Sequence, residues 1–266
     1  MNLGDVLKIL DPDYIKKRPS NAMFVAAFMV ILGFASAFVI FPAEFNISII
    51  TFSSLFMLPF VMRILETEKL GKTGTKIVDV FKRHNPIIMF FIFIFVGMTI
   101  EYTLLFGLAP PNIGNVAFEQ QLNLVLRSPA GYFAGPDIFW EIVTNNIRLV
   151  FICMLLSVFY GVGAIFILNY NSSIVGMIYG SGIRTLVWGA TYPVFPNPLW
   201  YLPHIILEVA AYLLASIAGA MMYRSIKLGE KSYNKLMRDS MLLLAFSIIL
   251  IFVAGYVEIT VPFIPR

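Results

Sequence analysis

Long apolar stretches alternate with shorter polar segments along the chain, a pattern typical of proteins that cross a membrane several times. A helix needs about 20 mainly apolar residues to cross the hydrocarbon core of a bilayer. The stretches that approach or meet this length, and that we predict to be transmembrane helices, are Asn21–Phe41, Ile47–Val61, Pro86–Gly107, Ile147–Leu168, Pro203–Tyr223 and Met241–Val261.

The positions of Lys and Arg indicate how these helices are oriented, because basic residues accumulate on the cytoplasmic side of a membrane. Basic residues cluster in residues 8–18, 63–83 and 224–238, whereas residues 108–146 contain only Arg127. We therefore expect the N-terminus in the cytoplasm, residues 108–146 outside, and the C-terminus outside.

This orientation requires one crossing more than the six long stretches supply. The candidate is Ser172–Val194, which is rich in glycine and contains Arg184. We predict that it crosses most or all of the bilayer as a short or broken helix shielded by protein, because irregular backbone is not tolerated in contact with lipid. A re-entrant loop is the alternative, and it would require the positive-inside rule to fail at one end.

The remaining segments complete a single all-α integral membrane domain over residues 1–266. Residues 1–20 have apolar positions at helical spacing and are expected to form an amphipathic interfacial helix, with a disordered tail as the alternative. Residues 108–146 are rich in aromatic side chains and are expected to form an external cap. The other parts are the first three spans at 21–107, a core at 147–225, and a basic link with the last span at 226–266.

Composition supports the membrane assignment and excludes several functional classes. The 266 residues are 59% hydrophobic and 13% charged, with a mean hydropathy of +0.84, which is too apolar for a soluble protein of this size. The formal net charge of +4 comes from basic residues beside the spans, so it reports topology and does not indicate nucleic-acid binding. The single cysteine, Cys153, excludes an intramolecular disulfide or a thiolate metal cluster.

Polar side chains within or beside the apolar stretches are candidates for function, because an ionisable group in hydrocarbon is costly unless it is paired. In the expected topology most of them lie towards the external side. The predicted intramembrane polar cluster comprises Asn145, Asn146, His204, Glu208, Glu101 and Arg184.

His204 and Glu208 are four residues apart and therefore share one helix face. Such a pair could bind a metal, relay a proton or hydrogen-bond to a neighbouring helix. No further ligand occurs at a recognisable spacing, and the second histidine, His84, is expected on the cytoplasmic side. We therefore expect no metal site, no cofactor and no catalytic residue, and we favour a hydrogen bond that Glu208 accepts from Arg184, Asn145 or Asn146.

Small residues at four-residue spacing predict where helices approach closely in lipid. They occur in the fourth span, in the short segment and in the fifth span. The predicted packing residues are Ser157, Gly161, Gly176, Gly180, Ala211, Ala215 and Gly219. These residues should mark the tight centre of the bundle or a dimer interface.

The order of several of these residues resembles a known family. Paired asparagines precede a glycine-containing span, and a Pro-His pair followed by Glu opens a span rich in small residues. The matching positions are Asn145, Asn146, Gly161, Gly163, Leu168, Asn171, Pro203, His204 and Glu208. Residues Trp140–Ser225 thus resemble the stage II sporulation protein M family of integral membrane proteins, in an archaeal-type form, although Ser172 and Ile205 stand where that family usually has glycine. The resemblance implies a membrane protein whose namesake is a scaffold for peptidoglycan-degrading partners, and relatives in non-sporulating organisms imply a more general role.

Two functions are compatible with these features. The first is a non-enzymatic scaffold or assembly subunit, expected as a homodimer in the lipid bilayer and in contact with partner membrane or envelope proteins. The alternative is a transporter or channel component with an outward-facing polar cavity lined by His204, Glu208, Asn145 and Asn146. A membrane-embedded hydrolase is disfavoured, because the sequence contains no recognisable nucleophile and base set.

Overall fold

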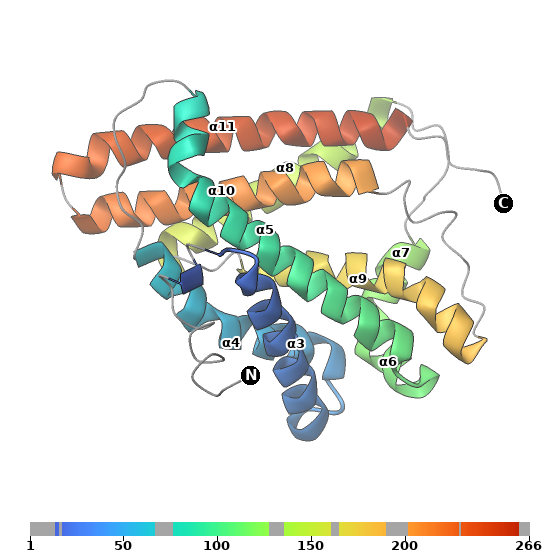
Figure 1. The fold of residues 1–266 in the computed structure, drawn as a ribbon. Helices are drawn as coiled ribbons and strands as arrows, with labels where there is room; N and C mark the ends of the chain where they lie inside the picture. Colours follow the sequence, from blue (N-terminus) through green and yellow to red (C-terminus); the bar gives the residue numbers. More distant parts are fainter. Residues whose placement is uncertain are drawn as a thin grey trace. The chain divides into compact units, whose positions relative to one another are not determined.

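The computed structural model describes residues 14–15, 18–66, 77–127, 136–160, 165–189, 202–228 and 230–260. Within these ranges the chain forms nine α-helices and no β-strand (Figure 1). Six of the helices are long and apolar enough to cross a membrane, namely Asn21–Ile40, Phe45–Ile64, Val78–Leu108, Asp137–Phe159, Pro203–Ile226 and Tyr233–Thr260. The predicted all-α, multi-pass architecture is therefore confirmed for the part of the chain that the structure describes.

The helices belong to two compact units, and each unit is assembled from segments that are distant in the sequence. The first unit contains Met1–Phe60, Phe90–Ala130 and Ile165–Pro198. The second contains Val61–Met89, Gly131–Ala164 and Leu199–Arg266. Two helices contribute residues to both units, α4 (Phe45–Glu66) and α5 (Ile77–Leu108).

In the first unit, α3 (Asn21–Ile40) packs against α4 and α5 through glycines. A Cβ atom added at Gly33 of α3 would lie 2.7 Å from the Cβ of Ser53 on α4. On α5, Gly97 meets the backbone of Met23 of α3 in the same way. Short side chains thus allow the helix backbones to approach closely, as is usual for helices in lipid.

The helix α9 (Ile165–Trp188) lies against α5 in the first unit, and two predicted packing residues form the contact. A Cβ at Gly176 would lie 2.5 Å from the Cβ of Tyr102, and a Cβ at Gly180 would lie 2.7 Å from the carbonyl oxygen of Thr103. The two short helices α6 (Pro111–Ala117) and α7 (Glu119–Arg127) follow α5 in the same unit.

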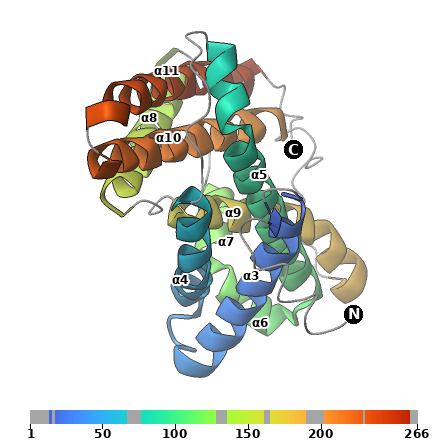
Figure 2. The same ribbon diagram turned by 60° about the vertical axis from the view of Figure 1, so that its left-hand side comes forward.

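In the second unit, α8 (Pro136–Tyr160), α10 (Leu202–Leu228) and α11 (Glu230–Thr260) lie side by side (Figures 1 and 2). The central helix is α10, in which residues 211–221 are all buried. The start of α5 completes this unit.

The helix boundaries differ from the prediction around the fourth span. Residues 147–168 were expected as one span, but α8 ends at Tyr160 and α9 begins at Ile165. The latter helix is unbroken as far as Trp188, whereas a short or broken helix was expected from Ser172. Gly189 follows the last residue of this helix, and its φ of 62° is accessible to glycine at low cost.

The helix α9 is not among the six candidate spans, although it is 24 residues long. Polar side chains lower its hydropathy, and those that are buried are Asn169, Ser172, Ser173, Ser181 and Arg184. Most of the predicted interfacial helix at 1–20, part of the predicted cap, and Gly161 with Gly163 lie outside the described residues.

Candidate functional site

A buried hydrogen-bonded group joins α8 to α10 in the second unit. The side-chain amide of Asn146 donates to a carboxylate oxygen of Glu208 at 2.8 Å. The hydroxyl of Tyr212 in turn donates to the carbonyl oxygen of the same asparagine side chain. Asn146 is therefore both donor and acceptor between two residues of α10, which fixes the orientation of its amide.

Helical spacing explains why these side chains meet. On α10, Glu208 and Tyr212 follow His204 at intervals of four residues, so all three share one face. His204 is buried near the start of this face. Further along α10, Gly219 packs against the backbone of Met154 and the Cβ of Ser157 on α8. The backbones of α8 and α10 therefore approach closely on the C-terminal side of Glu208 and Tyr212.

The third helix of the unit, α11, contacts α10 through the hydroxyl groups of two serines. Ser247 donates to the carbonyl oxygen of Ala211 at 2.8 Å, and Ser240 donates to that of Ala218 at 2.7 Å. Near the other end of α11, Glu258 is half-buried, as is Glu208 on α10.

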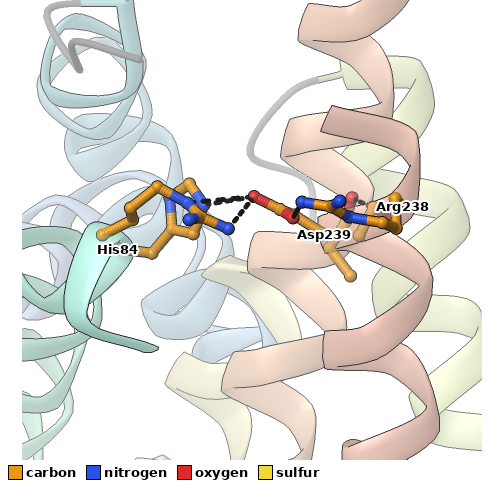
Figure 3. Close-up of polar contacts among 6 residues, drawn as sticks. His84, Arg238 and Asp239 are labelled. Atoms are coloured by element: carbon orange, nitrogen blue, oxygen red, sulfur yellow. Dashed lines mark hydrogen bonds and ion pairs between the residues drawn. The ribbon is translucent and has the colours of Figure 1, made fainter. Parts of the chain in front are cut away.

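A second polar group lies in the same unit between the start of α5 and α11 (Figure 3). Arg83 donates to one carboxylate oxygen of Asp239 from Nη2 at 2.7 Å and from Nε at 3.2 Å. His84 Nε2 lies 3.7 Å from the same oxygen, and Arg238 donates to the other at 3.2 Å. The carboxylate is only 1% exposed, so this group is a buried ion pair.

The first unit contains a polar network centred on Asn169 of α9. Its amide nitrogen lies 2.7 Å from the hydroxyl of Ser53, 2.9 Å from that of Ser54 and 3.1 Å from the carbonyl oxygen of Ile50, all on α4. Its carbonyl oxygen accepts from the hydroxyl of Tyr102 on α5 at 2.8 Å. One side chain therefore connects three helices.

A neighbouring chain of amides attaches α7 to α4 and α9. Gln121 donates to Ser173 at 2.8 Å, and its carbonyl oxygen accepts from Asn46 at 2.5 Å. Asn46 also donates to the backbone carbonyl of Ala117 at 2.6 Å. These bonds hold the segment after α5 against the first unit.

Arg184 of α9 is completely buried in the first unit. Its guanidinium donates to the carbonyl oxygens of Phe106 at 3.2 Å and Pro111 at 3.0 Å, and to Asn115 Oδ1 at 3.1 Å. It also lies 4.4 Å from the ring centroid of Phe106. Because a helix end leaves carbonyl groups without partners in the helix, the arginine stabilises the turn between α5 and α6.

The structure brings together some of the residues of the predicted polar cluster and separates others. Asn146, Glu208 and His204 belong to the second unit, and Asn145, also in that unit, is exposed. Glu101 and Arg184 belong to the first unit. Of the predicted packing residues, those buried between the helices of the second unit are Ser157, Ala211, Ala215 and Gly219.

Several residues of these polar groups were not identified from the sequence. Tyr212 could have been found, because it continues the four-residue spacing of His204 and Glu208. Asp239 is an acidic residue at the end of a basic segment, which is a weak signal for an ion pair. Asn169 gave no signal, because an uncharged amide has no obvious partner until the helices are assembled. No group of three or more His, Cys, Asp or Glu that could hold a metal occurs among the described residues.

Comparisons with known proteins agree with the membrane architecture. The family model described as stage II sporulation protein M matches residues 86–261. An uncharacterized protein of Methanocaldococcus jannaschii is 28% identical over 127 residues, which cover 46% of this chain and 68% of that protein. No solved structure gives a significant match. The family match includes α8 to α11, and hence the Asn146–Glu208 group and the buried Arg184.

Proposed function

Because this chain belongs to the stage II sporulation protein M family, we propose that it is a non-enzymatic scaffold or assembly subunit of a membrane complex. The proposal rests on the two hydrogen bonds of the Asn146 side chain. Both its donor and its acceptor are bonded to residues of α10 in the same chain. A polar group committed in this way stabilises a helix pair, and it is not presented to a solute.

The first unit supports the same interpretation. Asn169 bonds to Ser53, Ser54 and Tyr102, and the guanidinium of Arg184 bonds to backbone and side-chain oxygens. Interhelical hydrogen bonds in membrane proteins contribute about 0.6 to 2 kcal/mol each. A set of such bonds in each unit gives a rigid framework to which other membrane proteins can bind.

The homodimer expected from the sequence belongs to this proposal. Ala211, Ala215 and Gly219, which were candidates for a dimer interface, are buried against helices of their own chain. A homodimer would therefore use a different face.

The proposed scaffold function can be tested by measuring whether the chain is part of a larger complex in native membranes. We expect the tagged full-length chain, solubilised in mild detergent, to migrate in blue-native electrophoresis in an assembly larger than the purified chain. Deleting its gene should dissociate the remaining members of that assembly, and wild-type complementation should restore it. The purified chain in proteoliposomes should give no flux of protons or small ions above that of protein-free vesicles.

A transporter or channel component is the second candidate, and the carboxylate of Glu208 within the candidate span of α10 favours it. An ionisable side chain inside a membrane span often marks an ion or proton pathway. The discriminating variant is Glu208→Gln, which keeps an acceptor for Asn146 and removes the charge. If the wild-type chain carries a flux and Glu208→Gln abolishes it at unchanged thermal stability, the protein is a transporter. If gene deletion also leaves the membrane complexes intact, the scaffold function is wrong.

A further inference from the structure

One face of α8 changes character along its length. Its first turns expose Asp137, Ile138 and Trp140, and the next two turns expose Glu141, Thr144, Asn145 and Arg148, which we call the polar stripe. The continuation of the same exposed face towards the end of the helix is apolar, at Phe151, Ile152, Leu155 and Phe159. The spacing of three and four residues places all of these side chains along one side of the helix.

The apolar part of this face is too short to cross a bilayer. Phe159 and Arg148 are 159 − 148 = 11 residues apart, which corresponds to about 16 Å of helix, roughly half of a hydrocarbon core about 30 Å thick. The candidate membrane span of α8 nevertheless begins at Asp137. The polar stripe therefore lies within the part of α8 that is long and apolar enough to cross a membrane.

The neighbouring helix α11 gives a direct comparison of depth. Val143 of α8 lies against Gly255 of α11, with its Cγ2 2.9 Å from a Cβ added at the glycine. The ring of Trp140 contacts that of Phe252 at 6.2 Å between centroids. At this level α11 exposes apolar side chains, Phe252 at 38% and Val253 at 45%.

Exposed apolar residues of α11 and exposed polar residues of α8 thus occur at the same depth of one unit. Apolar side chains such as Val253 are suited to contact with acyl chains. A carboxylate, an amide and a guanidinium are not, because each is costly in hydrocarbon without a partner. The polar stripe is therefore covered by something other than lipid.

The charges of Glu141 and Arg148 distinguish a second copy of this chain from a different protein as the partner. Two copies of this chain in one membrane share an orientation, so a two-fold axis along the membrane normal places equal depths opposite each other. Glu141 would then face Glu141 and Arg148 would face Arg148, and like charges in apolar surroundings repel strongly. A second copy is therefore disfavoured on this face.

We propose that the polar stripe binds a membrane helix of a different protein, which carries a carboxylate at the depth of Arg148 and an amide or hydroxyl group at the depth of Asn145. This inference rests on the proposed scaffold function and identifies the face and the chemistry through which a partner binds. Buried polar contacts of this kind specify a partner because every mismatch leaves a group unpaired.

Site-specific photo-crosslinking in native membranes tests the proposal. A photoreactive benzoylphenylalanine is placed at Thr144 in the stripe, at Val253 at the same depth on α11, and at Leu155 on the apolar part of the α8 face. We expect a protein adduct from position 144 only. Peptide mapping should place it in a membrane helix of another protein that contains an acidic residue.

Charge variants distinguish a specific contact from proximity. Arg148→Gln should reduce the yield of the adduct at least about ten-fold. Arg148→Glu should do the same, and changing the acidic residue of the mapped helix to Lys should restore the yield. The matched control Arg63→Gln, an exposed arginine at the end of α4, should leave the yield unchanged.

Three outcomes would overturn the proposal. An adduct with a second copy of the chain would show a homomeric interface, an intramolecular adduct would show that the chain covers its own stripe, and labelling by lipid or water alone would show that nothing binds there. If the larger assembly on native gels survives Arg148→Gln and no partner adduct forms at Thr144, the scaffold function stands and this face is not its interface. If no assembly exists, the proposed function itself fails.

Discussion

Asn145 and Asn146 are adjacent in the sequence, yet one is exposed and the other is buried. Successive residues of an α-helix point in directions about 100° apart, so neighbours meet different surroundings. Asn146 is directed at α10, where it bonds to Glu208 and Tyr212. Asn145 is directed away from the unit, in the polar stripe. The pair can therefore be separated experimentally into a structural residue and an interface residue.

Stability should distinguish the two asparagines. Asn146→Ala leaves the half-buried Glu208 and the buried Tyr212 without their shared partner, so the free energy of unfolding should fall by about 1 to 3 kcal/mol. Asn145→Ala is the matched control and should change it by less than about 0.5 kcal/mol. Unfolding in mixed detergent micelles measures both. Equal losses in the two variants would show that the burial of Asn146 has no energetic consequence.

The close approach of α8 and α10 predicts a strong effect of substitution at Gly219. A Cβ there would meet the backbone of Met154 and lie 2.8 Å from the Cβ of Ser157. Gly219→Val should therefore destabilise the chain by about 1 to 3 kcal/mol through overpacking. Gly182→Ala is the control, because open space surrounds that position, and higher helix propensity should stabilise the chain by about 0.5 to 1 kcal/mol. The measurement is thermal unfolding in detergent, and a tolerated valine at position 219 would contradict the packing.

Arg184 should not be replaceable by lysine. The guanidinium reaches Phe106, Pro111 and Asn115 at once and stacks on the Phe106 ring, whereas an ammonium is a compact charge that cannot reproduce this fork. We expect Arg184→Lys to lower the free energy of unfolding by about 1 to 3 kcal/mol, the cost of leaving buried polar groups unsatisfied. Proteolysis near the α5–α6 turn should become faster in the same variant. An unchanged cleavage rate would refute the stabilisation of this turn.

The ion pair between Arg83 and Asp239 predicts coupled losses of stability. Removing one member of a buried ion pair typically costs about 3 to 5 kcal/mol, because the remaining charge loses a close partner of opposite sign. We therefore expect Asp239→Asn and Arg83→Gln each to be strongly destabilising, and the double variant to lose clearly less than the sum of the two. Lys82→Gln is the exposed control on the same helix and should change stability by less than about 0.5 kcal/mol. Additive losses would mean that the two side chains do not act as a pair.

The sequence predicted those features of the fold that depend on local hydropathy. The first span was expected at Asn21–Phe41, and α3 occupies Asn21–Ile40. The polar helix α9 was placed less well, because its Asn169 and Arg184 are balanced by partners on other helices. A hydropathy scale includes the free-energy cost of placing these polar side chains in lipid. It does not include the interhelical hydrogen bonds that offset this cost.

The sequence gives the depth of a residue in the membrane but not the direction of its side chain, and this explains why the predicted polar cluster differs from the observed one. Topology assigns a residue a height in the membrane, and Asn145, Asn146, His204 and Glu208 were grouped on that basis. It does not give the direction in which a side chain points around its helix axis. Asn145 was therefore grouped with Asn146 although the two face different surroundings. The direction is set by interhelical packing, which the sequence specifies only through the assembled fold.

The bond between Arg83 and Asp239 joins residues 156 positions apart, and this separation has a consequence for biogenesis. At a synthesis rate of about 5 to 20 residues per second, the arginine is added to the growing chain roughly 8 to 30 s before its acceptor. During that interval its charge must stay hydrated at the membrane surface or be sheltered by the insertion machinery. The second unit is therefore complete only after α11 has been translated, and a chain truncated before α11 would lack the carboxylate that Arg83 binds.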